Sequence, residues 1–354
     1  MTHWLNHRFD IPHPIIQAPM AGVSSPAMAA AVCNAGGMGS LGVGAMTADA
    51  ARAAIQQTRA LTERPFNINV FCHGPVARDA KVEADWLAAM APEFARFNAA
   101  PPDALNEIYQ SFLTNPDMLA MLVDEAPTVV SFHFGLPEAS VISALKSAGI
   151  TLLASATSLP EAHACQAAGI DAIVAQGIEA GGHRGIFDPT APDAELTTDA
   201  LVAQLAPHID LPIIAAGGLM NGGDIARVLS LGAEAAQLGT AFIASTESLA
   251  DAAYRAALRA PSSYPATLTP SVSGRPARCL RNGFIAWSEQ TDATIPAYPV
   301  AYDAAKALAG AAASAGVSGF GAQWSGAGGL WARHGSAGDI VTWLVAELAA
   351  SQRG

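Results

Sequence analysis

A histidine in a glycine-rich turn is the side chain of this sequence best suited to chemistry. Residues 176–184 read Gln-Gly-Ile-Glu-Ala-Gly-Gly-His-Arg and directly follow the apolar segment 171–175. A buried strand ending in such a turn is where α/β enzymes place working residues. The imidazole of His183 is suited to proton transfer near neutral pH or to holding an anion. The alternative is a solvated loop histidine, and the rest of the chain must distinguish the two.

Two further glycine-rich turns predict a phosphate site. They follow two successive apolar segments and contain Gly217 and Gly218 in the first turn, and Gly239 and Thr240 in the second. Loops at this position in α/β barrels bind phosphate through unpaired backbone N–H groups. Neither turn matches a P-loop or the dinucleotide fingerprint, which favours a mononucleotide. Taken singly, each turn is equally well explained as a tight strand-to-helix connection.

Amide groups at three other strand ends are suited to a heteroaromatic ring. Residues 17–22 read Gln-Ala-Pro-Met-Ala-Gly, Asn69 lies in the apolar segment 66–71, and Gln176 ends another. An amide side chain both donates and accepts hydrogen bonds, as the mixed edge of an isoalloxazine ring requires. Singly, Asn69 and Gln176 are more often structural, but their shared position at strand ends favours a ligand role.

Short apolar segments separated by alanine-rich helical patterns define the elements that must position these residues. Continuous apolar strands alternating with helices indicate a parallel sheet covered on both faces. Eight such units predict an α/β fold of the (β/α)₈ TIM-barrel type, with the site in the loops that follow the strands. The eight predicted strands are 14–17, 38–43, 66–71, 128–134, 150–154, 171–176, 211–216 and 235–239.

The helical patterns and the connection lengths predict three regions. Amphipathic helices are expected over 24–35, 159–168 and 224–231, each followed by a glycine that ends it. The connection 75–127 is too long for an ordinary loop and predicts a helical insertion within a barrel over 1–244. Residues 245–320 predict a mainly helical region that covers the barrel mouth, and 321–354 a segment closing on the barrel through a last helix at 337–352.

Composition excludes several classes of partner. The 354 residues carry a formal net charge of −12 without a dense basic cluster, which argues against nucleic acid and anionic membranes. No bulky apolar stretch is long enough to cross a bilayer, and the N-terminus lacks a secretory pattern, so we expect a cytoplasmic protein. The spacing of Cys33, Cys72, Cys165 and Cys279 suggests neither a metal site nor a disulfide framework. The pattern does not define an oligomeric state.

In combination, these motifs resemble the FMN-dependent nitronate monooxygenases, specifically the bacterial class I branch. The resemblance covers nearly the whole chain and rests on residues 14–22, Asn69, 176–185, 215–218 and 237–240. It implies FMN as cofactor and His183 as the catalytic residue beside it. The cofactor-binding residues it implies are Ala18, Pro19, Met20, Asn69, Gln176, Gly181, Gly217, Gly218, Gln237, Leu238, Gly239 and Thr240.

The resemblance also implies a substrate-binding set: Tyr109, His133, Tyr298, Tyr302 and Lys306. The last three are spaced by four residues, which places them on one face if the segment is helical. Such stripes are usually ordinary amphipathic surface, so Tyr109 and Lys306 are expected as substrate contacts rather than catalysts. The chain departs from the family pattern at 278–283, which affects the contacts of the covering region and hence the size of the substrate.

The implied reaction is oxidation of an alkyl nitronate, with propionate 3-nitronate a plausible member, by FMN and O₂ to a carbonyl compound and nitrite. The expected partners are therefore a small anionic nitronate and O₂. His183 would hold the anionic nitro group, or act as a base if a neutral nitroalkane is accepted. The alternatives are an FMN-dependent enoyl-thioester reductase that uses NAD(P)H, and a flavin-binding protein without turnover.

Overall fold

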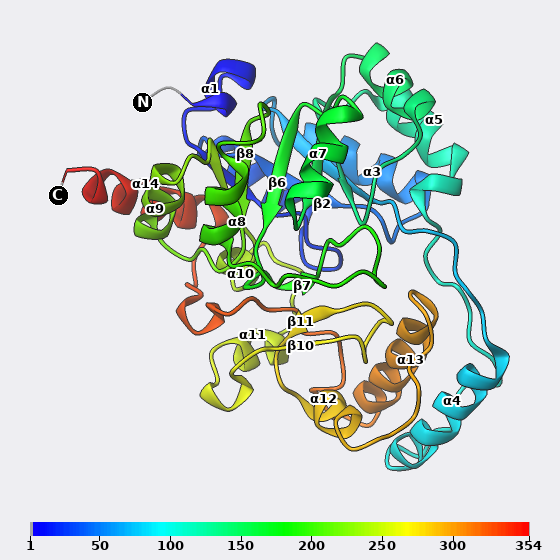
Figure 1. The fold of residues 1–354 in the computed structure, drawn as a ribbon. Coiled ribbons are helices and arrows are strands. Elements are labelled where there is room, and N and C mark those ends of the chain that lie inside the picture. The colour runs from blue at the N-terminus through cyan, green and yellow to red at the C-terminus, as the bar shows by residue number, and fades with distance from the viewer. Residues whose placement is uncertain (1–2, 354) are drawn as a thin grey trace.

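In the computed structural model, which describes residues 3–353, eight parallel strands form a barrel (Figure 1). Their order is β1-β9-β8-β6-β5-β4-β3-β2, and a parallel bridge from Ile16 to Met38 joins the two ends. The strands are β1 (Ile15–Gln17), β2 (Gly39–Gly42), β3 (Phe66–Phe71), β4 (Val129–His133), β5 (Thr151–Ala156), β6 (Ala172–Gln176), β8 (Ile213–Ala216) and β9 (Ala235–Leu238). All eight coincide with predicted segments, and the predicted (β/α)₈ barrel is confirmed.

Helices cover the outside of the barrel. They are α2 (Pro26–Asn34), α3 (Ala48–Arg59), α5 (Pro116–Glu125), α6 (Ala139–Ser147), α7 (Leu159–Ala167), α8 (Thr198–Leu205), α9 (Gly222–Ser230) and α14 (Ala337–Ser351). Local signals set their ends, because the Ser25 side chain caps α2 and Asn221 with Asp224 forms a capping box on α9. The last helix, α14, packs against α9 and α2 and closes on the barrel.

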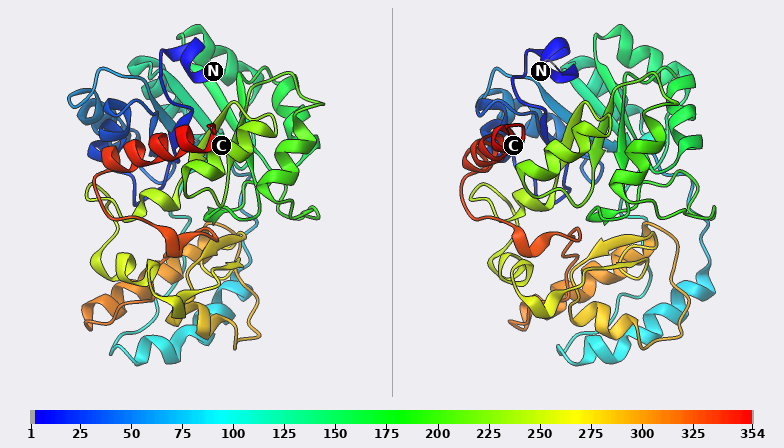
Figure 2. Two further views of the ribbon diagram at one scale, coloured as in Figure 1. Left: turned by 90° about the vertical axis from the view of Figure 1, so that its left-hand side faces the viewer. Right: turned by 60° about the vertical axis from the view of Figure 1, so that its left-hand side comes forward.

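A second lobe lies at the end of the barrel where the strands finish (Figure 2). It contains α4 (Ala80–Ala95), α11 (Ala252–Leu258), α12 (Gly283–Ser288), α13 (Val300–Ser314), and the strands β10 (Thr267–Thr269) and β11 (Ala277–Cys279). Its own apolar core includes Trp86, Phe94, Phe284, Leu308 and Phe320. This lobe therefore combines the early insertion with the late region, since α4 packs against α13.

The predicted insertion 75–127 divides between the two parts of the molecule. Its first helix, α4, belongs to the second lobe, whereas α5 packs against α3 and α6 as the barrel helix between β3 and β4. The region 245–320 carries β10 and β11 in addition to its helices. The division of the chain at 244 and 320 is accordingly a proposal about domains, and the observed contacts define the lobe used below.

A short strand joins barrel and lobe. β7 (Gly182–His183) leaves the end of β6 and pairs antiparallel with β11, with His183 opposite Ala277. The turn that the sequence singles out is thus held by a segment more than ninety residues further along the chain. Across residues 3–353 no helix is both long enough and apolar enough to span a membrane. The four cysteines are buried free thiols.

Candidate active site

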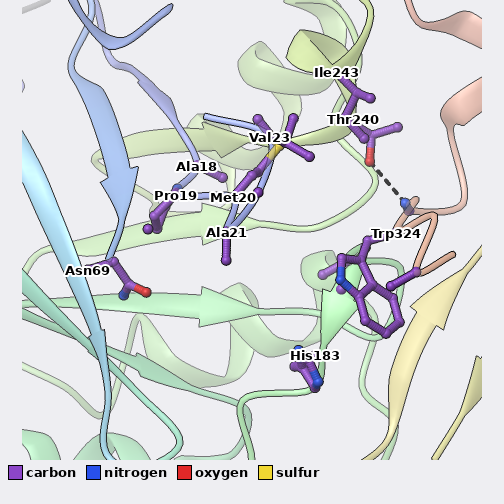
Figure 3. Close-up of a pocket in the computed structure, with 18 of the residues that line it drawn as sticks. Ala18, Pro19, Met20, Ala21, Val23, Asn69, His183, Thr240, Ile243 and Trp324 are labelled. Atoms are coloured by element: carbon purple, nitrogen blue, oxygen red, sulfur yellow. Dashed lines mark hydrogen bonds between the residues drawn. The ribbon is translucent and has the colours of Figure 1, made fainter. Parts of the chain in front are cut away.

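One cavity of about 650 Å³ opens at the carboxyl ends of the barrel strands and extends under the second lobe. Figure 3 shows Ala18, Pro19 and Met20 on one side of it and His183 with Trp324 on another. All eighteen residues expected to bind cofactor or substrate line this cavity. The tertiary fold therefore brings together positions that extend from Ala18 to Lys306 in the chain.

The first wall of the cavity, here the barrel wall, consists of the turns after β1, β8 and β9. The backbone amides of Gly218, Gly239 and Thr240 donate no hydrogen bond to any of residues 3–353, so they remain available for a ligand. Gly217 and Gly218 have φ values of +124° and +70°, a region that side chains disfavour. The wall thus presents unpaired N–H donors and little side-chain bulk.

Gly239 differs from the other glycines of this wall. Its φ of −105° suits any residue, and a Cβ there would lie 3.5 Å from the Ala18 Cβ, an ordinary contact. By contrast, a Cβ at Gly181 would lie 2.4 Å from the Gly326 nitrogen. Packing of the chain therefore explains Gly181, whereas at Gly239 the missing side chain leaves open a space that only a ligand would use.

The two amide side chains lie where the sequence predicts, but their bonding differs. Asn69 donates through Nδ2 to the Ser131 Oγ at 2.9 Å, which leaves its carbonyl oxygen as an acceptor (Figure 3). Gln176 uses both ends of its amide within the chain: Nε2 donates to the His183 carbonyl at 3.0 Å and Oε1 accepts from the Gly185 N–H at 2.8 Å. Gln176 therefore fixes the histidine turn as well as lining the cavity.

His183 lies in the opposite wall, here the lobe wall, and its hydrogen bonds define its tautomer. The imidazole Nε2 is 2.8 Å from the Ser273 Oγ. The Ser273 hydroxyl donates to the Arg275 carbonyl at 3.2 Å, since a carbonyl can only accept. Its single proton being used there, Ser273 accepts from Nε2–H of His183, which leaves Nδ1 as the unprotonated nitrogen of the neutral ring.

Burial keeps the histidines of this wall neutral. It lowers the pKa of His183 to about 3, and the nearby His133 and Arg275 lower it further. Burial likewise lowers the pKa of His133, whose Nε2 lies 3.2 Å from the His183 carbonyl, to about 4. Both rings are uncharged at neutral pH, so neither supplies a positive charge for an anion in the empty cavity.

Aromatic rings complete the lobe wall. Tyr298 and Tyr302 reach it from the start of α13, with ring centroids 5.4 Å and 6.5 Å from that of His183. Burial raises the pKa of Tyr302 to about 12. The Tyr298 hydroxyl is buried without a partner among residues 3–353, so this residue offers the cavity its ring rather than its O–H group. The exposed Lys306 places Nζ 4.9 Å from the ring centroid of Tyr109.

Several residues of the site have no prior signal in the sequence pattern. Trp324 lies 5.0 Å from His183, ring to ring, and comes from an irregular segment that bridges to Cys279. Phe134 packs against His183 at 5.5 Å. Ser273 and Arg275 belong to a Ser-Gly-Arg-Pro run at 273–276. That run is the one local hint, because Gly274 has a φ of +91° and a Cβ there would meet the Tyr298 nitrogen at 2.4 Å.

The barrel, the cavity at the ends of its strands and the histidines in its wall define an α/β-barrel enzyme. The model of the nitronate monooxygenase family matches residues 3–347. A nitronate monooxygenase of Paraburkholderia phytofirmans is 58% identical over 339 residues, 96% of this chain and 93% of that protein. One of Pseudomonas aeruginosa is 49% identical, covering 98% and 99%. The chain belongs to the nitronate monooxygenase family, a family of oxidoreductases.

Solved structures agree with this assignment. A nitroalkane oxidase from Streptomyces ansochromogenes superposes with a TM-score of 0.89 at 42% identity and covers 99% of both chains. The FabK protein of Thermotoga maritima superposes with a TM-score of 0.76 at 27% identity, over 100% of this chain and 98% of that one. The likeness in sequence and fold is thus greater to the nitroalkane oxidase.

Proposed function

We propose that this enzyme oxidises alkyl nitronates with O₂, using FMN, to a carbonyl compound and nitrite. The observation that carries the proposal is one cavity whose two walls differ in chemistry, in a chain of the nitronate monooxygenase family. The barrel wall offers backbone donors for a cofactor phosphate, and the lobe wall offers rings and cations for a small anion. A cytoplasmic location is part of the same proposal.

The barrel wall fits FMN. A cavity of about 650 Å³ has room for a mononucleotide and a small substrate. The free amides of Gly218, Gly239 and Thr240 would hold the phosphate, and the Asn69 carbonyl oxygen would accept from the ring system. When bound, FMN supplies the electron transfer and the reaction with O₂.

On the lobe wall, we assign His183 to the substrate. Because its Nε2–H is bound to Ser273, Nδ1 is the nitrogen that can take a proton from a neutral nitroalkane or orient a nitronate. The neutral ring favours a role as orienting group or base over a role as fixed cation. Tyr302 and Trp324 flank the ring and exclude water from that side.

Lys306 supports propionate 3-nitronate as a substrate. Its ammonium group lies over the rings of Tyr109 and Tyr302, and no carboxylate among residues 3–353 forms an ion pair with it. A free cation at this position would pair with the carboxylate at the far end of such a substrate. We therefore expect Lys306→Met to raise KM for propionate 3-nitronate more than for an uncharged-tail alkyl nitronate.

Anaerobic stopped-flow spectroscopy of the FMN-loaded protein tests the proposal. Mixing with propionate 3-nitronate should reduce the flavin, and subsequent exposure to O₂ should release nitrite. Rapid bleaching by NAD(P)H, with no response to nitronate, would instead identify an enoyl-thioester reductase or related enzyme. A flavin that responds to neither would identify a binding protein, and purified protein that takes up no FMN would refute the cofactor assignment.

A further inference from the structure

Arg275 is a buried cation directly behind the lobe wall. Its side chain is 4% exposed, and its guanidinium carbon lies 4.3 Å from the ring centroid of Phe134. Nη2 donates to the Ile186 carbonyl, while Nε is buried without a partner among residues 3–353. Phe134 in turn packs against His183 and Tyr298, whose rings lie at 5.5 and 5.4 Å. One layer of aromatic rings therefore separates this charge from the cavity.

The neighbouring Arg184 shows how the same fold treats a buried cation that it neutralises. Arg184 is 3% exposed, and Asp193 receives hydrogen bonds from its Nε at 2.7 Å and from its Nη2 at 3.0 Å. No carboxylate of residues 3–353 pairs with Arg275 in this way. Glu161 and Asp188 act on it only from beyond ion-pair distance.

An unpaired buried charge is expensive. Removing an ion from water costs several kcal/mol even after the protein relaxes. Burial lowers the pKa of Arg275 only to about 10, so the group remains a cation at neutral pH. Its positive potential extends into the cavity through aromatic rings of low polarity, where charges are poorly screened. An anion in the cavity would supply the charge that the chain does not.

The other basic groups do not provide this potential. His73, His133 and His183 are neutral at neutral pH, mainly through burial, and Arg275 contributes to the lowered pKa of each. Lys306 is exposed, so water and salt screen its charge. The fixed, desolvated positive charge behind this wall is therefore that of Arg275.

We propose that Arg275 is a specificity-determining residue whose buried, unpaired charge makes the cavity select compact monoanions over neutral molecules of the same shape. This inference rests on the proposed function, in which the monoanion is the nitronate group and its neutral counterpart is the nitroalkane. Arg275 acts across Phe134 and Tyr298 without touching the ligand.

The test compares two probes of nearly equal shape, propionate and propionamide, by calorimetric titration of the FMN-loaded protein. The parent should bind propionate more tightly. Arg275→Met should reduce the propionate-to-propionamide affinity ratio at least tenfold and leave propionamide binding within twofold. Arg275→Lys should retain most of the ratio, because it keeps the charge. An unchanged ratio in Arg275→Met, or an equal loss of both ligands, would overturn the proposal.

Lys306→Met provides a second variant at an exposed position, so the proposal does not depend on the folding of Arg275→Met. Its ratio should remain above half that of the parent in 0.5 M NaCl, since added salt screens an exposed charge and not a buried one. Loss of the ratio in Lys306→Met would assign anion selection to Lys306 and refute the proposal for Arg275.

The two proposals fail separately. A protein that selects propionate through Arg275 but neither oxidises nitronates nor forms nitrite would retain this inference and lose the proposed function. A protein that oxidises nitronates with the same KM in the parent and in Arg275→Met, and binds propionate equally in both, would do the reverse.

Discussion

The two walls of the cavity are built in different ways. The barrel wall is made of turns that directly follow β1, β8 and β9, and it presents backbone N–H groups and glycines. The lobe wall is made of side chains from β7, α13 and the segments around 273 and 324, which are far apart in the chain. A fixed backbone suits an invariant cofactor group, whereas assembled side chains can adapt to a substrate.

The walls also differ in charge. The barrel wall positions partial positive charges of backbone amides, which no pH change removes. The lobe wall holds titratable rings that burial keeps neutral and one cation that burial leaves unpaired. Changes to the barrel wall should therefore affect cofactor retention, and changes to the lobe wall should affect turnover, selectivity and pH dependence.

Replacing the central residue of the lobe wall gives the largest expected effect. His183→Asn should retain bound FMN and lose turnover with nitronate by roughly 10²-fold or more, the usual contribution of a positioned acid, base or orienting group. Steady-state nitrite release and the flavin absorbance of the purified protein measure the two quantities. His208→Asn, at an exposed histidine, is the control and should be unaffected. Unchanged kinetics in His183→Asn would remove it from the mechanism.

A bulky residue at Gly239 should produce the opposite separation. Gly239→Leu should weaken FMN retention by about tenfold, roughly 1.4 kcal/mol, because its side chain would extend into the space beside the free amides. The backbone tolerates the change, since φ is −105°. FMN content after dialysis measures retention, and Gly310→Leu, where a Cβ meets nothing within 4 Å, is the control. A variant that keeps its full flavin would contradict the phosphate site.

The buried histidines predict loss of stability in acid. His73 is held neutral mainly by burial, which lowers its folded pKa to about 4 from an ordinary 6.5. The unfolded chain therefore binds more protons between those values, and stability should fall as the pH drops from about 6.5 to about 4, by at most ~1.4 kcal/mol per pH unit for this residue. Urea midpoints across this range measure the slope. His73→Phe should reduce it, and an identical slope would contradict the buried neutral state.

The smallest expected effect concerns the tautomer of His183. Ser273→Ala removes the acceptor for Nε2–H and should lower turnover about fivefold, in line with the loss of one hydrogen bond of ~1 kcal/mol. ¹⁵N NMR of the imidazole should show a mixture of tautomers in this variant and one tautomer in the parent. Ser273→Thr, which keeps the hydroxyl, should restore both. A single Nε2–H tautomer in Ser273→Ala would show that Ser273 does not set it.

Much of the barrel could be predicted because its signals are local. Buried parallel strands are continuous apolar runs, and Gly36, Gly169 and Gly232 end helices with φ values of +86°, +79° and +106°. The insertion was harder to predict, because α4 and α5 are both amphipathic helices in one long connection. Only their packing partners assign α4 to the lobe and α5 to the barrel.

The site divides in the same way. The glycine turns and Asn69 are recognisable from their places after apolar segments, and the resemblance to the family supplies Tyr298, Tyr302 and Lys306. Trp324 could not be predicted, because it lies in an irregular segment without periodicity. The bonding of Gln176 was also hidden, since one amide pattern suits a ligand and a loop equally well.

By itself, the sequence determined the barrel, the ends of its strands and the glycine-rich wall, because hydrophobic period, caps and turn residues act within a few positions. Only the tertiary structure decided which nitrogen of His183 is free and which buried arginine lacks a partner. Those properties depend on β7 meeting β11 and on Phe134 lying under Arg275. Hydrogen bonding and desolvation are set by neighbours in space, which spacing along the chain does not encode.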